Sequence, residues 1–134
     1  MAKTATTFRN SHLQAVADAL DNGYCRIYSG TVPTNANTAI GAQTLLAELR
    51  FAATAETSVT AGVLTFDDLT PDASANADGT PTFARCLSSD GTTVVVDMTA
   101  SGTGGGAELV LTTASIVAGA EVSADSATLT YPAA

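Results

Sequence analysis

The chain has 134 residues, a length that suits one domain able to bury about two-thirds of its unfolded surface. Apolar residues make up 46% of the chain, which excludes an intrinsically disordered polymer. Thirteen acidic residues against five lysines and arginines give a net charge of −8, which disfavours binding to nucleic acid or to an anionic membrane. No apolar run is long enough for a membrane-spanning helix, and the first residues lack the apolar core of a signal peptide, so we expect a protein made in the cytoplasm.

The N-terminal region divides into two parts. Residues 1–9 predict a flexible arm, which precedes a single domain over residues 10–134. Apolar side chains then recur with the spacing of an amphipathic helix over residues 11–21: Leu13, Val16, Ala17 and Leu20. Asn10 or Ser11 can cap the start of this helix, and Asn22-Gly23 supplies a left-handed residue that ends it.

Short segments that favour β-strands follow at intervals of about ten residues, separated by clusters of turn-forming residues. They cover residues 24–28, 45–51, 62–66, 82–87, 93–98, 108–112, Val122 with its neighbours, and 127–131. Three polar or glycine-rich segments are expected to be connections: 52–60, 67–79 and 101–106. Because no further helix intervenes, the pattern predicts a mainly β fold, an antiparallel β-sandwich (jelly-roll or immunoglobulin-like) with one short N-terminal helix.

The strongest local signal is a hairpin formed by the fourth and fifth of these segments, and its turn admits two registers. If Asp90-Gly91 forms a two-residue type I′ turn, Arg85 lies among apolar neighbours. If residues 88–90 form a type I turn with Gly91 in the left-handed conformation, Arg85 and Asp97 share the opposite face. An unpaired buried cation is costly, so the second register is favoured.

The favoured register assigns each hairpin side chain to a face. Five apolar side chains turn to one face: Ala84, Cys86, Val94, Val96 and Met98. The other face carries Arg85 and Asp97, where we expect both charges to reach water. Phe83 and Leu87 lie beside these charges and need cover from another part of the fold or from a partner.

The two cysteines are far apart in the sequence and match no metal-binding or Cys-x-x-Cys spacing. Cys25 and Cys86 each lie on the inward side of an expected strand. We therefore expect two buried, reduced thiols that pack as small apolar groups. A disulfide between them is the alternative, if their strands are neighbours.

One loop resembles the start of a calcium-binding loop, because oxygen-bearing side chains occupy every second position. These side chains belong to Asp72, Ser74, Asn76 and Asp78. However, Ala77 stands at the sixth position, where such a loop needs glycine, and Phe83 stands at the twelfth, where it needs a carboxylate. We therefore expect a solvated polar loop that holds no metal.

No group of residues has the spacing of a catalytic site. His12 is the only histidine and is expected on the exposed surface of the helix. Asp67 and Asp68 are expected at a loop edge, and the glycine-rich segment 102–106 lacks the lysine of a phosphate-binding loop. The sequence therefore predicts no enzymatic activity and no cofactor. Three tyrosines are candidates for surface recognition or for the edge of the core: Tyr24, Tyr28 and Tyr131.

The order of segments along residues 10–131 resembles a group of small structural proteins encoded in the head-assembly regions of tailed bacteriophages. Turns and strand edges carry this resemblance rather than reactive residues. The matching segments are 21–23, 25–33, 45–49, 61–65, 77–80, 89–94 and 116–120.

The resemblance implies a structural protein of the virion, with a capsid decoration or cement protein on the outer surface of the head as the first choice. It implies the major capsid protein and further copies of the chain as partners, with a trimer favoured. The alternative is a neck, tail or fibre module that binds a host-surface glycan. Tyrosine-lined pockets favour recognition, whereas an exposed apolar patch favours assembly. The candidate interface residues are Phe8, Arg9, Phe83, Arg85 and Leu87.

Overall fold

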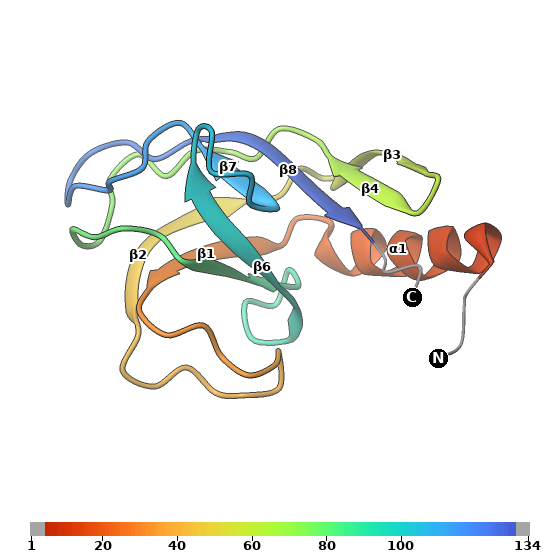
Figure 1. Ribbon diagram of the computed structural model, residues 1–134, viewed down its shortest axis with the longest axis horizontal. Coiled ribbons are helices and arrows are strands. Elements are labelled where there is room, and N and C mark those ends of the chain that lie inside the picture. The colour runs from red at the N-terminus through yellow and green to blue at the C-terminus, as the bar shows by residue number, and fades with distance from the viewer. Residues whose placement is uncertain (1–4, 131–134) are drawn as a thin grey trace.

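The computed structural model describes residues 5–130, which form eight strands and one helix (Figure 1). The helix is α1 (Thr6–Leu20), and the first four strands are β1 (Tyr24–Ser29), β2 (Thr44–Arg50), β3 (Glu56–Thr60) and β4 (Val63–Phe66). The last four are β5 (Phe83–Leu87), β6 (Val94–Gly102), β7 (Leu109–Leu111) and β8 (Ala124–Thr130). No described helix has the length and apolar character needed to cross a membrane.

All eight strands belong to one sheet in the order β2-β1-β5-β6-β7-β8-β4-β3. This confirms a mainly β fold with one helix. The expected two-sheet sandwich is not confirmed, because strand pairing is continuous and the sheet curls as a half-barrel (Figure 1). Neighbouring strands are antiparallel except β6 and β7, which run parallel.

The glycine-rich segment after β6 makes the parallel pair possible. A parallel neighbour normally requires a long crossover, whereas only residues 103–108 connect β6 to β7. Gly104 and Gly106 both have positive φ values, 88° and 72°, which other residues rarely adopt. A Cβ atom on Gly102 would lie 2.6 Å from the Cα atom of Ala114, so the chain passes too closely for any side chain there.

The helix begins at Thr6, five residues earlier than predicted, so residues 6–9 of the expected arm are helical. Residues 1–4 of that arm lie outside the described part of the chain. Neither Asn10 nor Ser11 caps the helix, because both lie inside it. The side chain of Asn10 instead accepts a hydrogen bond from the Gly62 N–H (2.9 Å). As predicted, Asn22 adopts the left-handed conformation just after the helix (φ 58°). The apolar stripe of α1 packs under the sheet and contacts β3, β4 and β6.

Strand β3 lies inside a segment that was predicted to be a polar connection. It pairs with β4 through a tight turn in which Ala61 and Gly62 both have positive φ values, 53° and 76°. Such a turn matches the twist of the strands that it joins. The prediction was wrong because β3 is mostly exposed and consists largely of glutamate, threonine and serine. Its sequence therefore lacks the alternation of apolar and polar residues that indicates a strand.

The long segment 67–79 is ordered by backbone hydrogen bonds rather than free in solvent. Thr70 and Arg50 exchange backbone bonds, and the Asn76 N–H donates to the Leu46 carbonyl, so this segment covers the outer edge of β2. On its other side, the segment pairs with residues 116–122. The hydrophobic core therefore lies inside a sheet whose β2 edge is closed by this segment.

Candidate functional site

The hairpin at β5 and β6 adopts the favoured register. The Gly91 N–H donates to the Ser88 carbonyl (2.9 Å), and Gly91 has a positive φ of 74°. Arg85 lies opposite Asp97, and Cys86 lies opposite Val96. The face assignment is therefore confirmed for Ala84, Arg85, Cys86, Val96, Asp97 and Met98. It was wrong for Val94, because a β-bulge pairs Val94 with Leu87 and leaves it exposed, while Val95 packs against the core.

Four charged residues form a row across neighbouring strands on the face opposite the core. Pairing places Glu48 of β2 opposite Arg26 of β1, Arg26 opposite Arg85 of β5, and Arg85 opposite Asp97 of β6. Arg26 Nε lies 2.7 Å from Glu48 Oε2, and Arg85 Nε lies 2.8 Å from Asp97 Oδ1. Each arginine thus has a carboxylate on its far side, which compensates for the two cations being neighbours.

The two ion pairs of this row differ in exposure. The side chains of Arg26 and Glu48 are 32% and 34% exposed, whereas those of Arg85 and Asp97 are only 6% and 14% exposed. The expectation that Arg85 and Asp97 both reach water was therefore wrong. The loop after β1 covers Arg85, which also donates from Nη2 to the Asn35 carbonyl (3.5 Å). The hydrogen-bonded carboxylate of Asp97 raises the pKa of the Arg85 guanidinium above its ordinary value.

The structure buries three of the five candidate interface residues. Phe83 is fully buried, Arg85 is 5% exposed, and Leu87 is 4% exposed. Phe83 stacks on the ring of Tyr28 from β1, with ring centroids 5.2 Å apart. These residues therefore form no exposed apolar patch, and the cover that the sequence required comes from the fold itself.

The remaining two candidates lie on the first turns of α1. Phe8 is 71% exposed, the most exposed of the large apolar side chains in the described residues. Arg9 is half-buried, and its Nη2 atom donates to the Thr6 hydroxyl (2.8 Å). The Nε atom of Arg9 packs over Gly62 at the β3–β4 turn. Phe8 is thus the one predicted interface residue that is freely accessible in the described structure.

The two described tyrosines, Tyr24 and Tyr28, line none of the main described pockets. Tyr28 is buried in its stack with Phe83, and Tyr131 lies outside the described residues. The ring of Tyr24 is covered by the guanidinium of Arg50, whose carbon lies 4.0 Å from the ring centroid. A tyrosine-lined pocket would have favoured recognition, but the three main described pockets contain no tyrosine. An exposed apolar patch with Phe83 and Leu87 would have favoured assembly, but both side chains are buried.

The two cysteines lie directly opposite each other on β1 and β5. Cys25 and Cys86 are both fully buried, and they are not bonded to each other. The predicted burial is confirmed, and neighbouring strands bring the thiols together as the disulfide alternative requires. A hydrogen bond with Cys25, together with burial, raises the pKa of the Cys86 thiol well above its ordinary value.

The loop that resembles a calcium site uses its carboxylates for backbone contacts. Asp72 Oδ2 accepts from the Glu48 N–H (2.9 Å), and Asp72 Oδ1 accepts from the Ser74 N–H (3.0 Å). Asp78 Oδ1 accepts from the Ala118 N–H. Among the described residues, no group of three or more potential ligands is placed to hold a metal ion. The carboxylates of Asp72 and Asp78 thus help to hold this segment against β2 and against residues 116–122.

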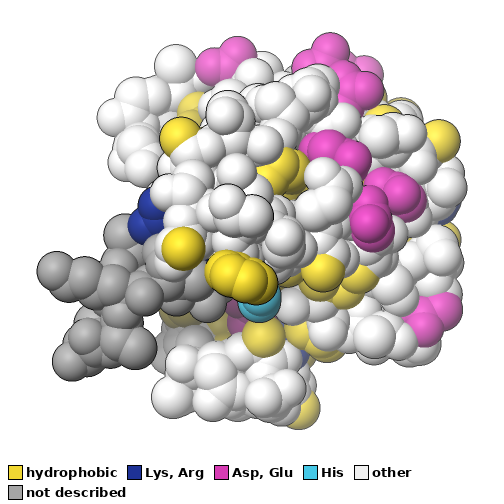
Figure 2. Space-filling model, turned by 90° about the vertical axis from the view of Figure 1, so that its right-hand side faces the viewer, with side chains coloured by type: hydrophobic (Ala, Val, Ile, Leu, Met, Phe, Trp, Pro, Cys, Tyr) yellow, Lys and Arg dark blue, Asp and Glu magenta, His cyan; other side chains and the backbone are white. Residues whose placement is uncertain are grey.

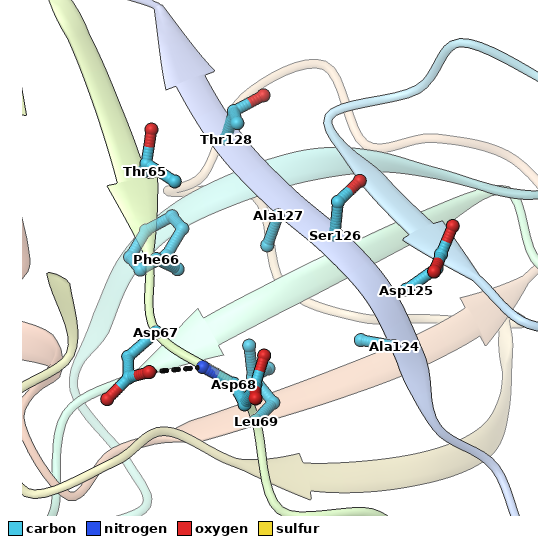
Figure 3. Close-up of a pocket in the computed structure, with 10 residues that line it drawn as sticks. All are labelled: Thr65, Phe66, Asp67, Asp68, Leu69, Ala124, Asp125, Ser126, Ala127 and Thr128. Atoms are coloured by element: carbon cyan, nitrogen blue, oxygen red, sulfur yellow. Dashed lines mark hydrogen bonds between the residues drawn. The ribbon is translucent and has the colours of Figure 1, made fainter. Parts of the chain in front are cut away.

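The groove that the sequence did not reveal lies between β4 and β8 (Figure 3). Its volume is about 190 Å³, and its apolar wall comes from Phe66, Leu69 and Ala127. Hydroxyl and carboxylate groups surround this wall: Thr65, Asp67, Asp68, Asp125, Ser126 and Thr128. Asp67 Oδ1 accepts a hydrogen bond from the Asp68 N–H (2.9 Å). Sequence patterns did not predict this site because it joins two strands about 60 residues apart in the chain.

The surface has an acidic character that extends beyond this groove. Figure 2 shows acidic side chains recurring across one face, with few lysines or arginines and with the histidine beside apolar side chains. In the described residues, arginine forms ion pairs with two carboxylates, those of Glu48 and Asp97. The net charge of −8 is therefore carried largely by carboxylates outside these pairs.

Comparison with protein-family models, with curated proteins and with solved structures finds no match to this chain. The resemblance to phage head proteins is thus neither supported nor opposed by these comparisons.

Proposed function

We propose that this chain is a non-enzymatic structural protein of a tailed-bacteriophage virion, bound to the outer surface of the head as a decoration or cement protein. The order of its turn and strand segments supports this, because it resembles that of small head proteins of tailed bacteriophages. An acidic surface also supports it, because carboxylates are repelled by a packaged genome. On this proposal, its partners are the major capsid protein and further copies of the chain, and it has no cofactor.

The observation that carries the proposal is the position of Phe8. The N-terminal end of α1 extends past the β3–β4 hairpin, away from the sheet (Figure 1). Phe8 lies on this end with 71% of its surface exposed, and the residues around it are polar. An aromatic side chain on a projecting element is a typical anchor for a protein partner. We therefore place the capsid contact at the tip of α1 rather than at the hairpin of β5 and β6.

We also propose that the curled sheet forms a sandwich-like fold. One core cluster joins residues of β1, β2 and β5 with residues of β4, β7 and β8, including Leu49, Cys86, Leu64 and Leu109. This packing supports a sandwich-like arrangement in which the curled sheet folds over itself. The two ends of the sheet would then correspond to the two layers of a jelly-roll or immunoglobulin-like sandwich.

The alternative is a neck, tail or fibre module that binds a host-surface glycan. It has weaker support, because the main described pockets contain no aromatic ring other than Phe66, which is buried. Sugar-binding sites commonly present an accessible aromatic face together with hydrogen-bonding groups.

A matched pair of variants tests the proposal. Phe8→Ser removes the exposed aromatic ring at the helix tip, and Val117→Ser changes another exposed apolar residue (56%) far along the chain. Both variants should unfold within about 0.5 kcal/mol of the native chain, because neither side chain is buried. Phe8→Ser should bind purified heads that lack this protein at least about tenfold more weakly, whereas Val117→Ser should bind normally. Equal binding by Phe8→Ser and the native chain would contradict the proposed contact.

A further inference from the structure

The two ends of the sheet differ in how their outer edges are covered. At one end, the segment 67–79 forms backbone hydrogen bonds with Arg50 and Leu46 of β2. At the other end, β3 pairs with β4, and no other described segment forms a backbone hydrogen bond with residues 56–60. Proteins often protect an edge strand with lysine, with proline or with a covering segment, but β3 contains neither lysine nor proline. In the described structure, β3 is therefore an open edge of the sheet.

The backbone groups available on this edge belong to Thr57 and Val59. A two-residue turn joins β3 to β4, so the flanking pair Thr60 and Val63 exchanges both backbone bonds. Bonded and non-bonded pairs alternate along antiparallel strands, so Val59 directs its N–H and C=O away from β4. Thr57 is the extra residue of a bulge and has no partner on β4. A strand that adds to this edge would therefore bond to Thr57 and Val59.

Two charged side chains lie at the two ends of β3. Glu56 begins the strand, and Arg9 of α1 packs over Gly62 in the turn that follows the strand. Among the described residues, Glu56 Oε2 and Arg9 Nε are the buried side-chain atoms that have no hydrogen-bond partner. Neither residue forms an ion pair within the described part of the chain. Because a desolvated charged group without a partner is costly, both groups favour a contact that supplies the opposite charge.

A groove runs beside β3 between these two charges. Gln14 donates to Glu56 Oε1 (2.9 Å) and Asn10 accepts from the Gly62 N–H, so α1 follows β3 from one charged end to the other. The groove has a volume of about 320 Å³ and is lined by Val59 and by four polar residues of α1: Thr7, Asn10, Ser11 and Gln14. An added strand would meet hydroxyl and amide groups here, which suit the threonine and serine side chains of β3 itself.

We propose that β3 of a second copy of this chain pairs with this edge, in antiparallel register about Ser58. The two sheets are then joined across a two-fold axis. In this register, Thr57 of each copy lies opposite Val59 of the other, so the available backbone groups of the two copies meet. Ser58 lies opposite Ser58 of the second copy.

Charge complementarity supports a second copy as the partner. In the same register, Glu56 of each copy lies opposite Thr60 of the other, beside the turn over which Arg9 packs. Each copy thus offers its unpaired carboxylate to the unpaired guanidinium of the other, and the symmetry forms two ion pairs. Such a contact uses the same surface on both copies and closes after two copies. It goes beyond the proposed function, because it assigns a surface for self-association that can be tested without a capsid.

A lysine at the centre of the contact tests the register. Ser58 is exposed, and Ser58→Lys would place two ammonium groups face to face in the dimer. In about 0.15 M sodium chloride, repulsion between charges more than about 8 Å apart is screened. Analytical ultracentrifugation should then show a dimer of the native chain that Ser58→Lys weakens at least about tenfold. Ser126→Lys makes the same change at an exposed serine of β8, an interior strand, and should dimerise like the native chain.

Reversal of the two charges tests the ion pairs. Arg9→Glu alone and Glu56→Arg alone each bring like charges together in a dimer, so each should weaken self-association at least about tenfold. A mixture of the two variants should associate like the native chain, because a dimer with one copy of each contains two restored ion pairs. A pair within one chain would not be restored by mixing, so this result shows that the charges meet between copies.

NMR locates the contact directly. The Val59 N–H should exchange slowly in the native dimer and rapidly in Ser58→Lys, and a mixture of isotope-labelled and unlabelled copies should show a nuclear Overhauser effect between Ser58 Hα atoms of different copies. The proposal is overturned if the native chain stays monomeric, if Ser58→Lys dimerises like the native chain, or if the mixed variants do not associate. A slowly exchanging Val59 N–H in a monomer would show that the edge is covered within one copy, and would also overturn it.

Discussion

Arg85 and Asp97 face each other across β5 and β6 in a two-pronged ion pair, with Nε–Oδ1 at 2.8 Å and Nη2–Oδ2 at 2.9 Å. Both side chains are largely buried, although one is a full cation and the other a full anion. Such a pair stabilises the fold only while both partners are present, because each charge would otherwise be buried alone. The hairpin and the loop that covers it therefore depend on this contact.

The first prediction concerns the stability that this pair controls. Arg85→Met should lower the free energy of unfolding by about 3 kcal/mol, because it leaves the carboxylate of Asp97 buried without a partner. Arg26→Met is the matched control, since it breaks a pair in the same row that is about one-third exposed, and it should cost less than about 1 kcal/mol. Urea denaturation measures both values. Similar losses for the two variants would show that burial of Arg85 is energetically unimportant.

The second prediction concerns the hairpin turn. The Asp90 carboxylate accepts bonds from the Ser88 hydroxyl, the Thr92 N–H, and the N–H and hydroxyl of Thr93. These hydrogen bonds, those from Thr93 most of all, lower the pKa of Asp90 because they stabilise its ionised form. Because this pKa is depressed in the folded state, the stabilisation is complete above the unfolded value of about 3.9 and is lost as the pH falls toward the folded value.

An NMR titration of the carboxyl groups checks this directly. Asp90 should remain ionised at a pH where exposed carboxylates have become protonated. Asp90→Ala should speed amide exchange at Thr92 and Thr93, and it should flatten the loss of stability below about pH 4. Ser89→Ala changes an exposed side chain of the same turn and should alter neither result. An ordinary pKa for Asp90 would mean that the turn is not held by its carboxylate.

The third prediction concerns the thiols. Cys25 and Cys86 should react with Ellman's reagent only when denaturant is added, and two equivalents should then appear, because both are fully buried. The raised pKa of Cys86 lowers its reactivity further, since the thiolate is the reacting form. An intact mass two daltons lower, with no thiol released by denaturant alone, would show a cross-strand disulfide instead.

The fourth prediction concerns the loop that resembles a calcium site. Asp72→Ala should lower stability by about 1–2 kcal/mol, because the N–H of Glu48 on β2 loses its acceptor. Ser74→Ala is the control, since its exposed side chain lies in the same loop, and it should change stability little. Calorimetry with millimolar calcium should give no saturable heat with the native chain. A saturable heat that Asp78→Ala abolishes would contradict this account.

The sequence predicted the features that depend on neighbouring residues. The register of the hairpin follows from the short-range bonds of Asp90 and from the left-handed Gly91, so turn chemistry alone was sufficient. Burial of Arg85 could not be predicted in the same way. It depends on Asn35, which is 50 residues away, and on the course of a loop without periodic pattern.

Other features were missed because packing overrides local pattern. The first turn of α1 contains Phe8 and Arg9, and Arg9 gains contact with the β3–β4 turn that no helical spacing could reveal. The groove between β4 and β8 arises where two distant strands separate. Because residues 6–9 of the expected arm are helical, a deletion of residues 1–9 would remove the first turn of α1 and disturb the domain itself.

The location of the chain on intact virions tests the central claim most directly. A cryo-electron microscopy map of purified particles, compared with particles that lack this protein, should show many copies on the outer face of the head. The tip of α1 with Phe8 should lie against the major capsid protein. Density restricted to the neck, tail or fibres, or a head surface identical in the two maps, would contradict the decoration proposal.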